Sequence, residues 1–193
     1  MDGFPRAKTQ AYNGTLYSDT RYFIIKWLEK ELPTCSGSVL NVSAGGWVVP
    51  KQLLDPAKVT KYATTDIAQY GDSVNHVDVV ADVHSLPSEW SNAWDVVLDL
   101  EALECYEDPR QAVSELYRVL KPGGVLLLSS PFNYRFFGAG TGLAEKVNPV
   151  KDYWRFTRDG LLLLTKGFAQ VQVNGFGGEG EHDRYTYCLK AIK

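Results

Sequence analysis

An apolar segment that runs directly into a cluster of small residues most constrains the fold of this 193-residue chain. Residues 38–42 read Ser-Val-Leu-Asn-Val, and residues 43–46 read Ser-Ala-Gly-Gly. The first group predicts a strand buried on both faces, and Gly45 and Gly46 permit a tight turn whose backbone can approach a ligand. Asp66 ends the next apolar segment about 20 residues later, where a carboxylate can accept hydrogen bonds from ribose hydroxyls. This order predicts a nucleoside-containing cofactor.

Strand-like and helix-like segments alternate along the rest of the chain, and this alternation predicts a parallel sheet. Strands are expected at residues 39–43, 60–65, 77–81, 94–100 and 125–130. Helices are expected from Ser18 or Asp19 to Pro33, from Asp108 to Leu120 and from near Thr157. The last two strands, at 168–175 and 184–192, have no helix between them, so we expect them to pair antiparallel.

Composition bounds the class of protein. With 45% hydrophobic and 22% charged residues, the chain is expected to form one domain over residues 1–193. The formal net charge of −3 argues against nucleic-acid binding through bulk electrostatics. A signal pattern and a membrane-spanning apolar run are both missing from the sequence, so a cytoplasmic location is expected. Three widely spaced cysteines are expected to be reduced and structural, and the oligomeric state stays open.

Five segments follow one another in a fixed order. They are residues 39–46, Asp66, Ala81-Asp-Val-His-Ser-Leu-Pro87, Trp94-Asp-Val-Val-Leu-Asp-Leu-Glu-Ala-Leu-Glu104 and Arg118-Val-Leu-Lys-Pro-Gly-Gly124. Together they resemble the class I S-adenosylmethionine-dependent methyltransferases. The resemblance implies an α/β, Rossmann-like fold whose seven-stranded sheet is mostly parallel, with an antiparallel last strand and helices on both faces. Asp152-Tyr-Trp-Arg-Phe-Thr157 is also similar to a hexapeptide of some small bacterial methyltransferases.

The resemblance implies S-adenosylmethionine as the cofactor, and it assigns the cofactor contacts by position. The turn would contact the methionine and ribose of the cofactor, and Asp66 would bind the ribose diol. Ile67 and the segment at Asp82 would contact the adenine. Asp99 and its neighbours would lie beside the methyl group. The expected cofactor-binding residues are Asn41, Ser43, Ala44, Gly45, Gly46, Asp66, Ile67, Asp82, Val83, Asp99 and Leu100.

The chain departs from the family pattern at three positions of the turn. Asn41 stands where an acid is usual, Ser43 where a glycine is usual, and Trp47 at the third glycine position. We expect Asp99 to compensate for the charge that Asn41 lacks. The departures also keep open a non-catalytic, methyltransferase-like partner subunit. A nicotinamide dehydrogenase is a third alternative, since its fold would show a similar turn and acid.

Methyl transfer from a sulfonium is an in-line displacement that needs alignment of the reacting atoms and no metal. A hydroxyl acceptor also needs a base, and the candidates are Glu101, Glu104, His84 and Tyr153. Residues 1–37 are expected to form an N-terminal helical cap, and residues 131–153 a substrate-side insertion. The expected substrate-binding residues are Tyr134, Tyr153, Trp154 and Arg155. Residues 135–158 hold five basic against two acidic residues, which favours a small-molecule acceptor that is a saccharide or a phosphorylated metabolite.

Overall fold

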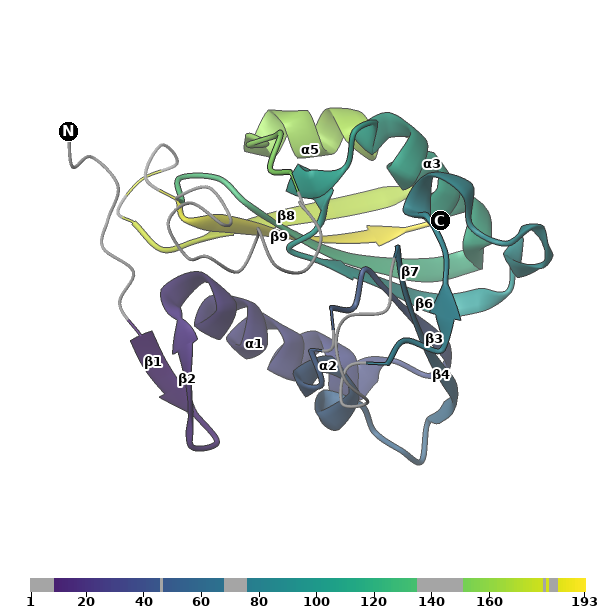
Figure 1. Cartoon of the computed structure of the whole chain (residues 1–193), viewed down its shortest axis with the longest axis horizontal. Helices are drawn as coiled ribbons and strands as arrows, with labels where there is room; N and C mark the ends of the chain where they lie inside the picture. Colours follow the sequence, from purple (N-terminus) through teal and green to yellow (C-terminus); the bar gives the residue numbers. More distant parts are fainter. Residues whose placement is uncertain (1–8, 46, 68–75, 135–150, 179, 181–183) are drawn as a thin grey trace.

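A seven-stranded sheet with helices on both sides forms the centre of the protein in the computed structural model (Figure 1). The structure describes residues 9–45, 47–67, 76–134, 151–178, 180 and 184–193. The strands of this sheet are β3 (Gly37–Val42), β4 (Val59–Asp66), β5 (Val79–Val80), β6 (Trp94–Leu100), β7 (Leu120–Pro131), β8 (Gln170–Phe176) and β9 (Thr186–Ile192). The helices are α1 (Asp19–Glu31), α2 (Val49–Leu53), α3 (Pro109–Val119) and α5 (Arg158–Leu164). Short 3-10 turns occur at η1 (Leu32–Thr34), η2 (Val83–Ser85), η3 (Ser88–Trp90) and η4 (Leu103–Cys105).

The sheet follows the order β5-β4-β3-β6-β7-β9-β8. Strand β3 pairs in parallel with both β4 and β6, whereas β9 pairs antiparallel with β7 and β8. The predicted fold, including the antiparallel last strand, is therefore confirmed. Strands β4 and β5 lie on one side of β3, and the strands from β6 onward lie on the other side. The carboxyl ends of β3, β4 and β6 therefore border the switch point, at which the strand order reverses and where such sheets bind ligands.

Polar side chains begin the helices at the predicted residues. The Ser18 hydroxyl accepts a hydrogen bond from the Arg21 amide at the start of α1. The Asp108 carboxylate accepts bonds from two amides at the start of α3, and the Thr157 hydroxyl accepts one at the start of α5. These bonds satisfy amides that lack partners within the helix. Each cap fixes where its helix starts.

Two hydrophobic clusters lie on opposite faces of the sheet. Alternate residues of β3 divide between them: Val39 joins the cluster under α1, and Leu40 joins the cluster under α3 and α5. The helices occupy the corresponding sides in Figure 1, with α1 and α2 on one side and α3 and α5 on the other. Strand β3 is thus buried on both faces, as its apolar sequence predicts.

A two-stranded hairpin precedes α1 and was not predicted. Strands β1 (Thr9–Tyr12) and β2 (Thr15–Ser18) pair antiparallel around Asn13 and Gly14, both of which have positive φ. Gln10 donates a hydrogen bond to Asp19 across 3.1 Å and thereby ties the hairpin to the start of α1. The N-terminal segment thus contains a small sheet as well as the expected helix.

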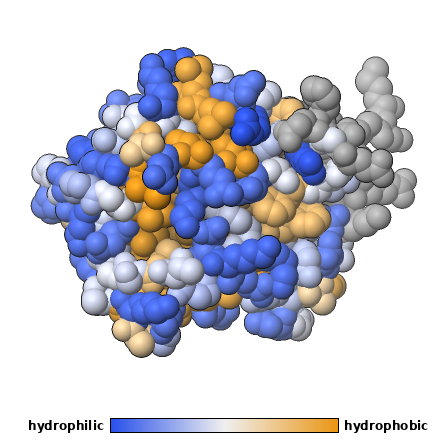
Figure 2. Space-filling model, turned by 180° about the vertical axis from the view of Figure 1, so that it is seen from behind, coloured by the Kyte–Doolittle hydropathy of each residue, from blue (hydrophilic) through white to orange (hydrophobic). Residues whose placement is uncertain are grey.

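Hydrophobic residues on the opposite face of the molecule form patches that hydrophilic residues interrupt (Figure 2). None of the helices in the described ranges has both the length and the apolar character needed to cross a membrane. Several large hydrophobic side chains are nevertheless exposed, and three of them, Ile67, Tyr153 and Trp154, lie among the predicted site residues.

Candidate active site

The carboxyl ends of β3 and β4 are joined by two hydrogen bonds at the small-residue turn. The Ala44 amide donates to the Thr65 carbonyl across 3.1 Å, and the Gly45 amide donates to the Asp66 carboxylate across 3.0 Å. A Cβ atom added to Gly45 would meet no atom closer than 4.0 Å, so the turn presents open backbone on that side. We name residues 43–45 the cofactor turn; Gly46 lies outside the described residues.

Asp66 is a buried carboxylate whose orientation is fixed by the backbone. Besides the bond from Gly45, it accepts a bond from the Ile67 amide across 2.7 Å. The Ile67 side chain that follows is 57% exposed. A buried acceptor beside an exposed apolar side chain offers both the polar and the apolar contact that a nucleoside needs.

Two residues other than glycine adopt left-handed backbone at the ends of neighbouring strands. Ser43, just after β3, has φ +49°, and Glu101, just after β6, has φ +55°. This region is unfavourable for residues with a Cβ atom, and such strain gathers at functional sites. Ser43 and Glu101 lie after the two strands that border the switch point. Contacts with surrounding residues must therefore hold the backbone there in its left-handed conformation.

A buried chain of hydroxyl and carboxyl groups lies beneath the cofactor turn. The Tyr106 hydroxyl donates to Asp99 Oδ1 across 2.6 Å and lies 2.8 Å from the Ser43 hydroxyl. Asp99 has no exposed surface, and its Oδ2 has no hydrogen-bond partner. Burial raises the pKa of Asp99 to about 7, although the bond from Tyr106 opposes that rise.

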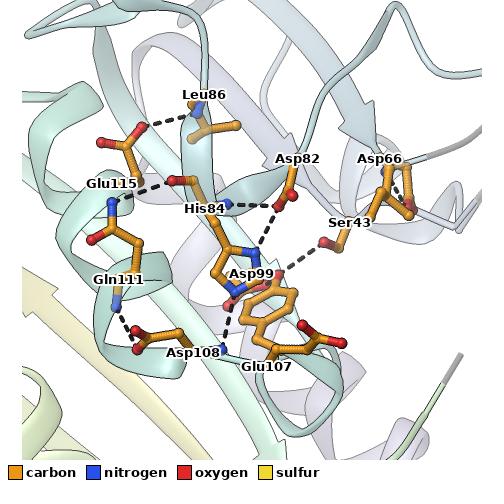
Figure 3. Close-up of polar contacts among 12 residues, drawn as sticks. Ser43, Asp66, Asp82, His84, Leu86, Asp99, Glu107, Asp108, Gln111 and Glu115 are labelled. Carbon is orange, nitrogen blue, oxygen red and sulfur yellow. Dashed lines mark hydrogen bonds and ion pairs between the residues drawn. The ribbon is translucent and has the colours of Figure 1, made fainter.

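The His84 ring is held by the Asp82 carboxylate and by the backbone amide of Asp108. Its Nδ1 lies 2.7 Å from Asp82 Oδ1, and its Nε2 accepts a bond from the Asp108 amide across 3.3 Å (Figure 3). Although burial acts to raise the pKa of Asp82, the hydrogen bonds from the His84 amide and ring hold it below the ordinary value. With Nε2 accepting, the proton of neutral His84 resides on Nδ1. Both ring nitrogens are therefore occupied by protein partners. The neighbouring Val83 is buried.

The Glu101 carboxylate is oriented by two hydroxyl groups. Ser129 donates to its Oε1 across 3.2 Å, and Thr186 donates to the same atom across 3.1 Å. Burial raises the pKa of Glu101, while the positive charge of Arg21 and the two hydroxyl bonds act against that rise. Glu101 is only partly covered, unlike Leu100 before it. It is thus a carboxylate whose orientation is set by two hydroxyl groups.

Glu104 is the buried partner of this acid. Its side chain is 4% exposed, and its Oε2 has no hydrogen-bond partner. Burial and, after it, the negative charge of Glu101 raise the pKa of Glu104 well above its ordinary value. Burial and the repulsion from Glu101 both favour the protonated form of Glu104.

The segment 151–156 binds to the backbone next to this pair of acids. The amides of Tyr153 and Trp154 both donate to the Glu104 carbonyl, across 2.8 and 3.2 Å. The indole of Trp154 donates to the Tyr106 carbonyl across 2.8 Å, while 42% of the side chain stays exposed. Three predicted elements, the cofactor turn, the end of β6 and this segment, therefore meet around Glu104 and Tyr106.

The other predicted substrate residues lie beside that segment. Arg155 forms a two-pronged ion pair with Asp152 and also donates to the Tyr134 carbonyl across 3.3 Å. The Tyr153 hydroxyl donates to Glu107 across 2.9 Å. The part of the substrate-side insertion at 135–150 lies outside the described residues.

Some residues of the site escaped sequence reasoning. Tyr106 gave no signal because it stands alone in a polar stretch, without periodicity. Arg21, on α1, places its guanidinium 4.6 Å from the centre of the Trp47 ring and its charge near Glu101. Asn41 is buried and donates to the Tyr62 hydroxyl across 3.1 Å, so its side chain already has a partner in the protein.

The donor set fits a nucleoside cofactor better than a metal ion. Within the described ranges, no group of three or more His, Cys, Asp or Glu side chains is placed to hold a metal. The open backbone at Gly45, the fixed carboxylate of Asp66 and the exposed Ile67 suit an adenosyl group. The chain's own residues are thus compatible with S-adenosylmethionine.

Comparison with known proteins supports this conclusion. A family model described as a methyltransferase domain matches residues 45–128. A "Ubiquinone biosynthesis O-methyltransferase" of Pseudomonas savastanoi pv. phaseolicola is 28% identical over 165 residues, which cover 77% of this chain and 70% of that protein.

Solved structures share the fold at low sequence identity. A SAM-dependent methyltransferase from Archaeoglobus fulgidus superposes with a TM-score of 0.64 at 13% identity, covering 90% of this chain and 94% of that one. The CurJ carbon methyltransferase superposes with a TM-score of 0.62 at 21% identity over 88% of this chain, which spans about half of that protein (51%). The matched domain, the relatives and the shared fold together support an S-adenosylmethionine-dependent methyltransferase.

Proposed function

We propose that the protein transfers a methyl group to a hydroxyl of a small-molecule acceptor, a saccharide or a phosphorylated metabolite, and that Glu101 takes the hydroxyl proton. The observation that carries the proposal is the Glu101 carboxylate, which two hydroxyl groups orient at the end of β6. Its raised pKa makes it a stronger proton acceptor than an ordinary carboxylate.

The cofactor would be held by the ends of β3, β4 and β6. S-adenosylmethionine supplies the electrophilic methyl group when it is bound. We assign the ribose hydroxyls to Asp66, the adenine face to Ile67, and the methionine part to the cofactor turn and Leu100. The bonds from the Gly45 and Ile67 amides fix the Asp66 carboxylate before a ligand arrives, which reduces the ordering needed on binding.

Glu101 and Glu104 divide the acid and base roles. Because the protonated form of the buried Glu104 is favoured, we assign Glu101 as the member of the pair that is ionised and accepts a proton. His84 serves the structure in this proposal, since both of its ring nitrogens have protein partners.

The acceptor would lie against the exposed aromatic side chains of Tyr153 and Trp154, whose faces suit a sugar ring or another flat apolar surface. The relative from Pseudomonas is named an O-methyltransferase, which favours a hydroxyl acceptor. Arg155 already pairs with Asp152, so attraction to a phosphate would depend on Lys151 and Arg158 among the described residues.

The test follows methyl-labelled S-adenosylmethionine with a panel of saccharides, sugar phosphates and phenols. On any acceptor found, E101Q should lower kcat by about 10²- to 10⁴-fold and leave S-adenosylhomocysteine affinity within about twofold. E104Q should lose less, because a glutamine amide resembles a neutral carboxyl. E89Q, at an exposed acid of η3, is the matched control and should behave as the wild type.

Three outcomes would contradict parts of the proposal. Full activity of E101Q would exclude Glu101 as the base. Methylation of phenols alone would exclude the saccharide and phosphate classes. Failure to bind S-adenosylhomocysteine at millimolar concentration would favour the non-catalytic partner subunit instead.

A further inference from the structure

We infer that Tyr106 is a positioning residue for the cofactor turn. Its hydroxyl bonds to Ser43 and holds that residue in a left-handed backbone conformation, which a glycine would adopt without such a bond. The inference rests on the proposed function, because it assumes that residues 43–45 bind the cofactor. No sequence motif points to Tyr106. The contacts of its side chain and of its backbone carry the inference.

The first step is the backbone of Ser43. Its φ of +49° lies in the left-handed region, where a Cβ atom crowds the following carbonyl. A glycine would adopt this conformation freely, and a serine adopts it only where neighbouring contacts enforce it. The backbone bonds of the turn involve Ala44 and Gly45, whereas the contact made by the Ser43 side chain is its bond to Tyr106.

The second step is the direction of the hydrogen bonds. The Tyr106 hydroxyl has one proton, which it donates to Asp99 Oδ1. Its oxygen can therefore only accept from the Ser43 hydroxyl, 2.8 Å away. Each hydroxyl thus has a single orientation while Asp99 is ionised. The chain from Ser43 through Tyr106 to Asp99 anchors the turn after β3 to the strand β6.

The third step is the rigidity of Tyr106 itself. Its side chain is buried, and its ring stands edge-on to His84 with the centroids 5.7 Å apart. Its carbonyl accepts the bond from the Trp154 indole. One residue therefore contacts the cofactor turn, the end of β6, the segment at Asp82 and the acceptor segment. A residue fixed from so many sides can hold Ser43 in a conformation that Ser43 does not prefer.

The test removes only the hydroxyl. Y106F keeps the ring against His84 and should weaken S-adenosylhomocysteine binding about three- to tenfold by calorimetry, the effect of one net hydrogen bond. In the protein without cofactor, Y106F should also speed amide hydrogen exchange at residues 44 and 45. The matched control is Y117F: that ring, on α3, packs on Phe168 with centroids 5.0 Å apart. Its binding and exchange should equal those of the wild type.

The decisive measurement is rescue by glycine. S43G needs no hydroxyl to hold the left-handed turn, so Y106F should lose less than about twofold in affinity when it is introduced into S43G. A merely structural role of Tyr106 would give the same loss in both backgrounds. Wild-type affinity in Y106F, or an equal loss with and without S43G, would therefore overturn the inference.

Two further results remain informative. If Y106F does not fold, S43A breaks the same bond from the other side, and its unchanged affinity would overturn the inference. If the wild type does not bind S-adenosylhomocysteine, the proposed function fails, whereas exchange in the turn still tests the link between Tyr106 and Ser43. Unaltered exchange in Y106F would then refute that link by itself.

Discussion

Replacing Asp66 by alanine separates its expected role in binding from its role in folding. In the structure the carboxylate accepts bonds from the Gly45 and Ile67 amides, and in the proposed complex it also accepts two ribose hydroxyls. Hydrogen bonds to a charged group contribute about 1.5 to 3 kcal/mol each. Because the two ribose bonds share one carboxylate, we expect a combined loss of about 2 to 4 kcal/mol, or roughly 30- to 1000-fold in cofactor affinity.

The same substitution removes two bonds to backbone amides in the free protein. We expect a loss of about 1 to 3 kcal/mol in the free energy of unfolding, which lowers Tm by roughly 2 to 10 °C in a chain of this size. D78A is the matched control, because the Asp78 carboxylate accepts bonds from the amide and hydroxyl of Thr64 on the same strand. It should lose comparable stability and no affinity.

Calorimetry with S-adenosylhomocysteine and thermal unfolding measure the two effects on the same samples. The reasoning would be refuted if D66A bound the ligand as tightly as the wild type. It would be refuted equally if D66A and D78A lost the same affinity, since the effect would then follow stability and not contact with the ribose.

Two further predictions concern groups beneath and beside the turn. Asp99 has its pKa raised to about 7 in the folded chain from an ordinary value of about 3.9, so its contribution to stability falls as pH rises from about 4 to about 7. D99N should gain on the order of 4 kcal/mol relative to the wild type over that range in urea unfolding, and parallel stability curves would contradict this. W154F should lose about 1 kcal/mol of unfolding free energy with the bond to the Tyr106 carbonyl, and an unchanged urea midpoint would disprove that bond's contribution.

Much of the fold was predictable because local signals agreed with the tertiary structure. The strand predicted at 94–100 is β6, and the helix capped by Asp108 is α3. The N-terminal hairpin was missed although Asn13 and Gly14 form a strong turn signal between two alternating segments. The predicted strand at 77–81 is limited to Val79–Val80, which pairs with the end of β4 at the edge of the sheet.

The site was predictable where motifs mark strand ends and less so where side chains meet across the sheet. Asp66, Gly45 and Ile67 lie together as their spacing predicts. The pairing of Tyr106 with Ser43 joins residues 63 positions apart, and no local pattern encodes it. The assigned roles of these residues, the hexapeptide subset, the single-domain boundaries and the cytoplasmic location stay predictions.

The Glu104 carbonyl, which accepts two hydrogen bonds, couples acceptor binding to the protonation of the Glu104 carboxyl. Because two successive amides of the segment 151–156 bind this one oxygen, any shift of the segment on ligand binding moves the backbone that carries the Glu104 carboxyl. The surroundings of the Glu104 carboxyl then change, and the pKa of Glu104 changes with them. By thermodynamic reciprocity, the ligand and the proton must influence each other's affinity by the same factor. Because the protonated form of Glu104 is favoured in the free protein, acceptor binding that lowers the pKa of Glu104 would be accompanied by proton release.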